Sequence, residues 1–269
     1  MSKPELGRRL TRFLSNDAKF RQPLRSFLDV LLEHEGKAFF FGGLLRDVML
    51  FGPSVTPRDV DIVVDSVRTS FLEAVRTHVQ RRTRFGGLHL EAKGWLFDVW
   101  SLPSTWAFRE GVISGESFWN LPKTTFLNIQ AVVAEVKPRR GKPRKIFSNG
   151  FFEALSTRTL DINCEENPYP HLCVVQSLLS AAKLGFSMSR RLARYVLHHG
   201  TTDGLERLVE VQLHHYGSVQ AEKASLHRWL HVIRDQLASS SGLSVALPRQ
   251  RRREQMQLPF TLPAEHWVG

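Results

Sequence analysis

Asp59 and Asp61 are the first residues whose spacing indicates chemistry. They flank Val60 at the start of an apolar segment that we expect to form a strand from Asp59 to Val64. Alternate side chains of a strand point to opposite faces, so both carboxylates lie on one face. Two divalent cations such as Mg²⁺, held roughly 4 Å from each other by carboxylate oxygens, can activate an attacking hydroxyl and stabilise a leaving pyrophosphate. An isolated pair of this kind also fits an exposed strand end or turn.

Asp98 is a third candidate, because it lies between Phe97 and Val99 in an apolar segment. An unpaired charge inside such a strand is costly unless a cation or hydrogen bonds compensate it. A third metal-binding carboxylate fits this position.

Gly42 and Gly43 end the apolar run Ala38–Phe41 and precede a short helix expected from Leu44 to Leu50. Backbone N–H groups at the start of a helix can bind phosphate, and glycine allows a ligand to approach the backbone closely. The pair therefore fits a triphosphate site, although an isolated glycine pair is more often a simple turn.

The elements around these residues mix strands and helices without strict alternation, as in an α+β fold. Ser70 and Glu73 form a capping box that opens a helix, and Lys93 with Gly94 marks the turn of a hairpin. After Pro168 the chain is expected to be helical. The predicted helices span residues 5–14, 23–35, 44–50, 70–79, 171–184, 189–199, 204–214 and 219–237, and the predicted strands span 38–41, 59–64, 86–91, 95–102 and 126–136.

The segments FFFGGLLRD and RDVDIVVD together resemble the head domain of class II tRNA nucleotidyltransferases (CCA-adding enzymes) and of bacterial poly(A) polymerases, within the polymerase-beta superfamily. The family has a strand, G-G-x-x-R-D, a short helix and a strand with D-x-D. The resemblance assigns nucleotide binding to Gly42, Gly43, Arg46 and Asp47. It assigns catalysis and metal binding to Asp59, Asp61 and Asp98, the last in a segment that resembles the family hairpin carrying the third carboxylate.

Two further segments resemble the family in part. LPKTTFLNIQAVV resembles its R-D-F-T-x-N-A segment, with Asn128 as the match and Lys123 where arginine is expected, and both are assigned to the nucleotide. AAKLGF resembles the end of the neck helix, while the E-D-x-x-R element that selects the incoming base is absent.

The resemblance implies a mixed, mostly antiparallel sheet flanked by helices, followed by an all-helical, neck-like domain. We expect N-terminal helices in residues 1–36, the catalytic head in 37–165, the neck-like domain in 166–238 and a flexible basic tail in 239–269. The implied reaction moves an NMP from an NTP, ATP or CTP, to a hydroxyl acceptor such as the 3′ end of tRNA or a similar small RNA, with Mg²⁺ or Mn²⁺ as cofactor. Nucleotidylylation of a protein or nucleotide, or a degenerate RNA-binding protein, stays open as an alternative.

The composition agrees with a folded protein that meets a polyanion. The 269 residues have a formal net charge of +11, with 42% hydrophobic and 23% charged residues. Such a charge favours RNA as a partner, although it also fits unspecific solubility. The densest basic run fits either a phosphate-binding loop or a solvated one; its residues are Lys137, Arg139, Arg140, Lys142, Arg144 and Lys145.

Two other features concern the compartment. No segment resembles a signal peptide or a membrane span, so we expect a cytoplasmic protein without a membrane partner. Cys164 and Cys173 match no metal or redox spacing and are expected to be reduced thiols. The oligomeric state does not follow from the sequence.

Overall fold

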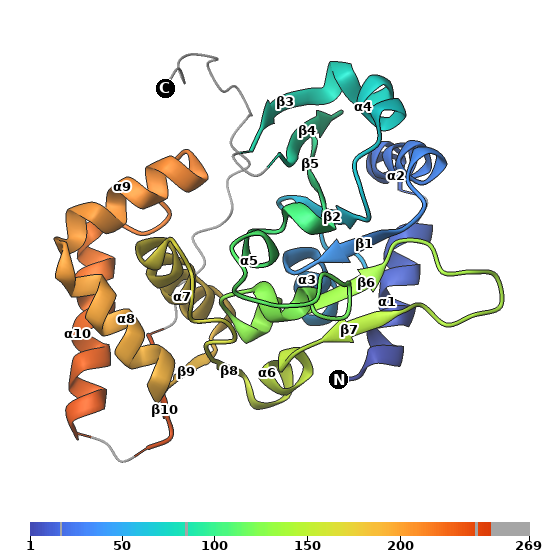
Figure 1. Ribbon diagram of the computed structural model, residues 1–269. Coiled ribbons are helices and arrows are strands. Elements are labelled where there is room, and N and C mark those ends of the chain that lie inside the picture. Colours follow the sequence, from blue (N-terminus) through green and yellow to red (C-terminus); the bar gives the residue numbers. More distant parts are fainter. Residues whose placement is uncertain (17, 84–85, 240–241, 249–269) are drawn as a thin grey trace.

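The computed structural model describes residues 1–16, 18–83, 86–239 and 242–248. A seven-stranded sheet with its helices forms one part of the molecule, and helices α7 to α10 form the other (Figure 1). Among the described residues, no helix has the length and apolar composition required to span a membrane. Cys164 and Cys173 are buried and free.

The sheet has the strand order β3-β4-β5-β2-β1-β6-β7. Strands β2 and β5 pair in parallel, and the other neighbouring strands of this sheet pair antiparallel within the described chain. This confirms the predicted α+β class with a mixed, mostly antiparallel sheet. The strands are β1 (Ala38–Phe41), β2 (Val60–Val64), β3 (Val79–Arg82), β4 (Leu88–Ala92), β5 (Trp95–Ser101), β6 (Val132–Glu135) and β7 (Ile146–Ser148).

The two faces of the sheet bury different groups of side chains. On one face Phe40, Ile62 and Phe97 join the main hydrophobic core beneath the N-terminal helices, and Phe97 stacks on Phe27 with 3.8 Å between ring centroids. On the other face Val63 joins a smaller cluster. The N-terminal helices and those of the head are α1 (Lys3–Ser15), α2 (Gln22–His34), α3 (Gly43–Phe51), α4 (Thr69–Val75), α5 (Trp106–Arg109) and α6 (Phe151–Thr157).

Three predicted elements were wrong in extent. The helix expected through Val79 ends at Val75, because Val79 pairs with Leu90 and opens the edge strand β3. The strand expected over residues 126–136 is reduced to β6, and a 3₁₀ turn at Asn128–Gln130 occupies its first half. Asp59 lies just before β2 instead of inside it.

The C-terminal helices were predicted to within a few residues. They are α7 (Pro170–Leu184), α8 (Arg190–Thr202), α9 (Gly204–Tyr216) and α10 (Lys223–Ser239). Gly185 ends α7 in a left-handed conformation, and the Ser189 hydroxyl accepts a hydrogen bond from the Leu192 amide at the start of α8. Three short strands were not expected: β8 (Thr159–Leu160), β9 (Ser187–Ser189) and β10 (Ser244–Val245).

Part of the predicted basic tail lies outside the described residues, which end at residue 248. The division into N-terminal helices, catalytic head, neck-like domain and tail stays a prediction. The main hydrophobic core is shared, because it includes residues of the sheet, of the N-terminal helices and of α7 to α10.

Candidate active site

Asp61 and Asp98 are register partners in the parallel pair of β2 and β5. Paired residues of neighbouring strands point to the same face of a sheet. Asp61 therefore shares a face with Asp98 and with Val63, which is two positions further along β2 and packs in the smaller cluster. The structure thus brings together two carboxylates that are 37 positions apart in the sequence.

Asp59 lies beside this pair and is bound to its neighbour Arg58. The Nε and Nη2 atoms of Arg58 donate hydrogen bonds to Oδ2 of Asp59 at 2.9 and 2.5 Å. Burial acts to lower the pKa of Arg58, but the charge of Asp59 and these hydrogen bonds outweigh it and raise the pKa above its ordinary value. Asp59 is therefore held by a fully charged guanidinium.

The three carboxylates are close enough to repel one another. Burial raises the pKa of Asp61 well above its ordinary value, and the charges of Asp59 and Asp98 raise it further. Arg58 and Arg46 oppose this shift with their positive charges. A cation between the carboxylates would relieve the repulsion.

His89 of β4 contacts Asp98. The two residues are register partners in the β4–β5 hairpin, and Nδ1 of His89 lies 2.5 Å from Oδ1 of Asp98. A row of three polar side chains therefore crosses β4, β5 and β2 in the order His89, Asp98, Asp61. The imidazole fixes the orientation of the Asp98 carboxylate.

The Gly42–Gly43 turn lies at the end of β1 next to the start of β2. Gly42 has φ of 59° and ψ of −106°, a conformation that only glycine adopts readily. Its N–H donates to the Val132 carbonyl and continues the pairing with β6, so this amide is not available to a ligand. The amides of the first turn of α3, which begins at Gly43, have no acceptor within the helix and are the donors suited to a phosphate.

Arg46 and Asp47 lie in α3 directly after this turn. Nε of Arg46 donates to Oδ1 of Asp47 at 2.7 Å, and both side chains are mostly buried. The positive charge of Arg46 acts on Asp61 and lowers its pKa. The Arg46 guanidinium thus lies near Gly43 and acts on the charge of Asp61.

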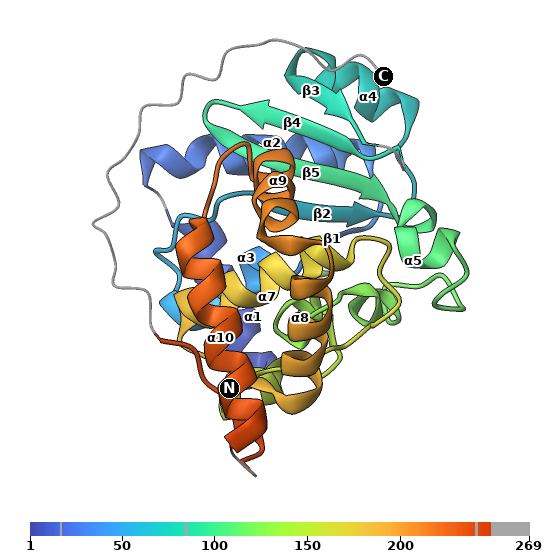
Figure 2. The ribbon, with the colours of Figure 1, turned by 90° about the vertical axis from the view of Figure 1, so that its left-hand side faces the viewer.

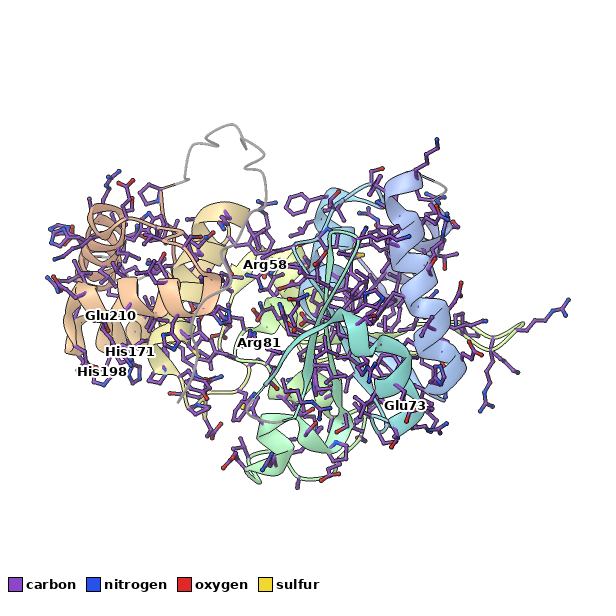
Figure 3. All side chains as sticks on the ribbon, turned by 90° about the horizontal axis from the view of Figure 1, so that it is seen from above. Arg58, Glu73, Arg81, His171, His198 and Glu210 are labelled. Carbon is purple, nitrogen blue, oxygen red and sulfur yellow. The ribbon has the colours of Figure 1, made fainter. Side chains whose placement is uncertain are left out.

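The C-terminal helices add charged and aromatic groups to the same place. The Arg58 guanidinium lies 5.4 Å from the ring centre of Tyr216, the last residue of α9. Burial lowers the pKa of Lys183 in α7, and the charges of Arg58 and Arg46 lower it further. In Figure 3, Arg58 and Arg81 lie between these helices and the sheet, and Figure 2 shows α9 in front of β5 and β2.

The carboxylate oxygens of Asp59, Asp61 and Asp98 suit a hard divalent cation, but in this structure they do not converge on one point. Among the described residues, no three histidine, cysteine or acidic side chains are grouped so that they could hold a metal ion. Asp59 and Asp98 are held by Arg58 and His89 instead. Oxygen donors of this kind are those of Mg²⁺ and Mn²⁺, and Asp59 would bind one after Arg58 turns away.

Lys123 and Asn128 occupy different environments. Lys123 is exposed in the 3₁₀ helix Leu121–Thr124. The Asn128 side chain donates to the Thr159 carbonyl at 3.2 Å and accepts from the Asp161 amide at 3.0 Å. Both ends of its amide thus fasten the segment that carries β8, and a nucleotide contact by Asn128 stays a prediction.

The basic run forms the hairpin loop between β6 and β7. This loop projects from the molecule on the side away from α9 and α10 (Figure 1). Arg144 is partly buried and donates hydrogen bonds to the carbonyls of Glu135 and Val136, and burial lowers its pKa to about 10. Arg144 thus fastens the hairpin, whereas the exposed cations are Lys137, Arg139, Arg140, Lys142 and Lys145.

Four neighbours of the carboxylates were missed in the sequence. His89 could have been found, since a two-residue turn at Lys93 and Gly94 places it opposite Asp98. Arg58, Lys183 and Tyr216 gave no comparable signal, because their position depends on how the C-terminal helices pack on the sheet.

The fold is that of the head and neck of tRNA nucleotidyltransferases, as solved structures show. The Thermotoga maritima CCA-adding enzyme complexed with tRNA superposes with a TM-score of 0.54 at 17% identity, over 75% of this chain and 48% of that one. The Bacillus stearothermophilus CCA-adding enzyme in complex with CTP superposes with a TM-score of 0.54 at 18% identity, over 80% of this chain and 52% of that one. A CCA-adding enzyme in complex with ATP superposes with a TM-score of 0.57 at 14% identity, over 83% of this chain and 53% of that one.

These likenesses concern the fold, and the chain spans about half the length of the enzymes it matches. No protein-family model matches the sequence, and no curated protein does.

Proposed function

We propose that this protein is a metal-dependent nucleotidyltransferase that moves an NMP from ATP or CTP to the 3′ hydroxyl of tRNA or a similar small RNA. The observation that carries the proposal is the register pairing of Asp61 with Asp98, next to Asp59. The fold of the CCA-adding enzymes, whose solved complexes contain tRNA, ATP or CTP, supports it.

The glycine turn and the cations around it provide the second half of the site. The amides at the start of α3, together with Arg46, would bind the triphosphate. Arg58 and Lys183 act on the same region with positive charge. The α3 amides, Arg46 and Lys183 would hold the leaving pyrophosphate in line with the acceptor, and Arg58 would neutralise phosphate oxygens on the acceptor side.

Each carboxylate has a separate task in this proposal. Asp61 and Asp98 would offer their oxygens to the cation from adjacent strands, and His89 would keep the Asp98 carboxylate in position. Asp59 would exchange Arg58 for the cation, which frees the guanidinium for a phosphate. A bound Mg²⁺ or Mn²⁺ would lower the pKa of the acceptor hydroxyl and stabilise charge on the transferred phosphoryl group.

Incorporation of labelled nucleotides tests the proposal. The protein is incubated with Mg²⁺ or Mn²⁺, total RNA and each of the four α-labelled NTPs, and the products are separated on a denaturing gel. We expect label at RNA 3′ ends, and a loss of at least about a hundredfold in rate for Asp61→Asn or Asp98→Asn. Asp29→Asn, at an exposed position of α2, is the matched control and should retain full activity.

The same assay distinguishes the alternatives. Label on a protein band or on a small molecule, with none on RNA, would replace the RNA acceptor by a protein or nucleotide one. RNA binding without any transfer, in the parent and in both variants alike, would indicate a degenerate RNA-binding protein and refute the enzymatic proposal.

A further inference from the structure

We propose that a cavity at the β4–β5 turn is a subsite for a nucleobase near the end of the acceptor strand, an inference that rests on the proposed transfer to nucleic acid. The cavity has a volume of about 270 Å³. This is near the lower limit of ligand sites, about 300 Å³, and suits one planar base better than a whole nucleotide. Its walls include Phe20, Thr56, Arg58, Lys93, Trp95 and Leu96.

Phe20 provides the surface on which a base would stack. Its side chain is 50% exposed, whereas Trp95 beneath it is buried, and the two rings are parallel within 4° at 6.5 Å between centroids. The Trp95 indole N–H donates to the Phe20 carbonyl at 2.7 Å. The Arg21 guanidinium also lies 5.2 Å from the centre of the Phe20 ring. The ring is therefore held by Trp95 and Arg21 before a ligand arrives, which reduces the entropy lost on binding, and a base would stack on its exposed part.

The charges at the cavity match a phosphate-bearing ligand. Arg58 and Lys93 both line it, and none of its described lining residues is acidic. Lys93 is exposed at the tip of the hairpin, and the described part of the chain places no carboxylate within ion-pair distance of its ammonium. Aromatic stacking next to cations is the usual arrangement for single-stranded nucleic acid.

The cavity lies at the end of the sheet where β5 begins, and residues of both faces line it. Leu96 and Arg58 connect it to the carboxylates, whereas Trp95, with Phe20 against it, lies on the opposite face with Phe97. Leu96 precedes Asp98 by two positions in β5, so it lies on the same face of the sheet, about 7 Å along the strand. The glycine turn, in contrast, follows β1, on the other side of β2 in the strand order. The attacking and leaving oxygens lie on opposite sides of the phosphorus, so this position suits the acceptor and not the triphosphate.

Binding of a fluorescein-labelled single-stranded RNA decamer, measured by anisotropy without NTP, tests the subsite. We expect Phe20→Ala and Lys93→Glu each to weaken binding at least about fivefold, and Phe20→Trp to retain it. Phe51→Ala, at a similarly exposed phenylalanine, is the control and should bind like the parent. Thermal unfolding of each variant verifies folding, and Lys93→Glu serves if Phe20→Ala does not fold.

A decamer in which the four nucleotides nearest the 3′ end are abasic gives the decisive comparison. If one of these bases stacks on Phe20, the abasic decamer binds the parent and Phe20→Ala equally, because the interaction is already absent. In steady-state transfer, Phe20→Ala should raise the KM for the decamer and leave the KM for the NTP within about twofold of the parent.

Several results would overturn the subsite. The first is equal affinity of the parent and Phe20→Ala for the intact decamer, and the second is an equal loss of affinity by Phe20→Ala for the intact and the abasic decamer. The others are an increase in Phe20→Ala of the KM for the NTP alone, and no RNA binding by the parent. Phe20-dependent RNA binding without transfer would refute the proposed function and leave the subsite standing. Nucleotide transfer that is equally fast in the parent and in Phe20→Ala, with equal RNA binding, would support the proposed function and refute the subsite.

Discussion

Replacing Asp61 by asparagine should stabilise the protein without metal while abolishing transfer. Asp61 is partly buried, and desolvation together with the charges of Asp59 and Asp98 raises its pKa well above the ordinary value of 3.8. The folded state therefore holds this proton to a higher pH than the unfolded state does. The free energy of unfolding falls as the pH rises through that interval, and asparagine removes this loss.

The magnitude follows from the register pairing. Neighbouring strands are about 4.8 Å apart, and two unit charges about 5 Å apart repel by about 3 kcal/mol at an effective dielectric constant of 20. Arg58 and Arg46 offset part of this repulsion. We therefore expect Asp61→Asn to raise the free energy of unfolding by about 1–2 kcal/mol at pH 8, with the gain disappearing below pH 4.

Urea unfolding at pH 8 and at pH 4, with a chelator present, measures this difference. Asp29→Asn is the control and should change stability by less than about 0.5 kcal/mol at either pH. Saturating Mg²⁺ should reverse the order, since it stabilises the parent and not the variant. A variant that is less stable than the parent at pH 8 without metal would refute the repulsion among the carboxylates.

Three other predictions follow from the backbone and from buried groups. Gly42→Ala should lower the free energy of unfolding by about 1–3 kcal/mol because φ is 59°, whereas Gly7→Ala, inside α1, should be neutral or stabilising in the same urea titration. Arg144→Ala removes hydrogen bonds to two carbonyls and should cost about 1–2 kcal/mol, with faster proteolysis of the β6–β7 loop as the readout. Burial raises the pKa of Cys164 to about 11 and of Cys173 to about 12, so a thiol reagent at pH 8 should label them only on unfolding; rapid labelling of the native protein would contradict this.

Local patterns predicted most elements but not their pairing. The long C-terminal helices were found because their apolar periodicity and capping residues are local signals. Val79 was placed in a helix because it continues the periodicity of Leu72 and Val75, and its pairing with Leu90 depends on a strand that follows later in the chain. The segment around Asn128 is apolar enough for a strand, but the Asn128 side chain bonds to backbone groups more than 30 positions away.

The candidate site was predictable as a set of residues and not as a geometry. The spacing of Asp59, Asp61 and Asp98 was visible, whereas the alignment of Asp61 with Asp98 requires β2 to pair with β5 in one register. The contact of Arg58 with Tyr216 depends on helix packing 158 positions further along the chain. Roles in catalysis and metal binding stay predictions until the variants are measured.

The parallel pairing of β2 with β5 has a consequence for insertions and deletions. The loop of residues 65–67, between β2 and α4, sets no part of the alignment of the two strands and should tolerate changes in length, whereas α4 buries Phe71 and Val75 in the core. A single residue inserted between Gly94 and Asp98 would instead turn that carboxylate toward the aromatic core on the opposite face. Libraries of single insertions should therefore yield inactive proteins from the four insertion points between Gly94 and Asp98, and active ones from the loop of residues 65–67.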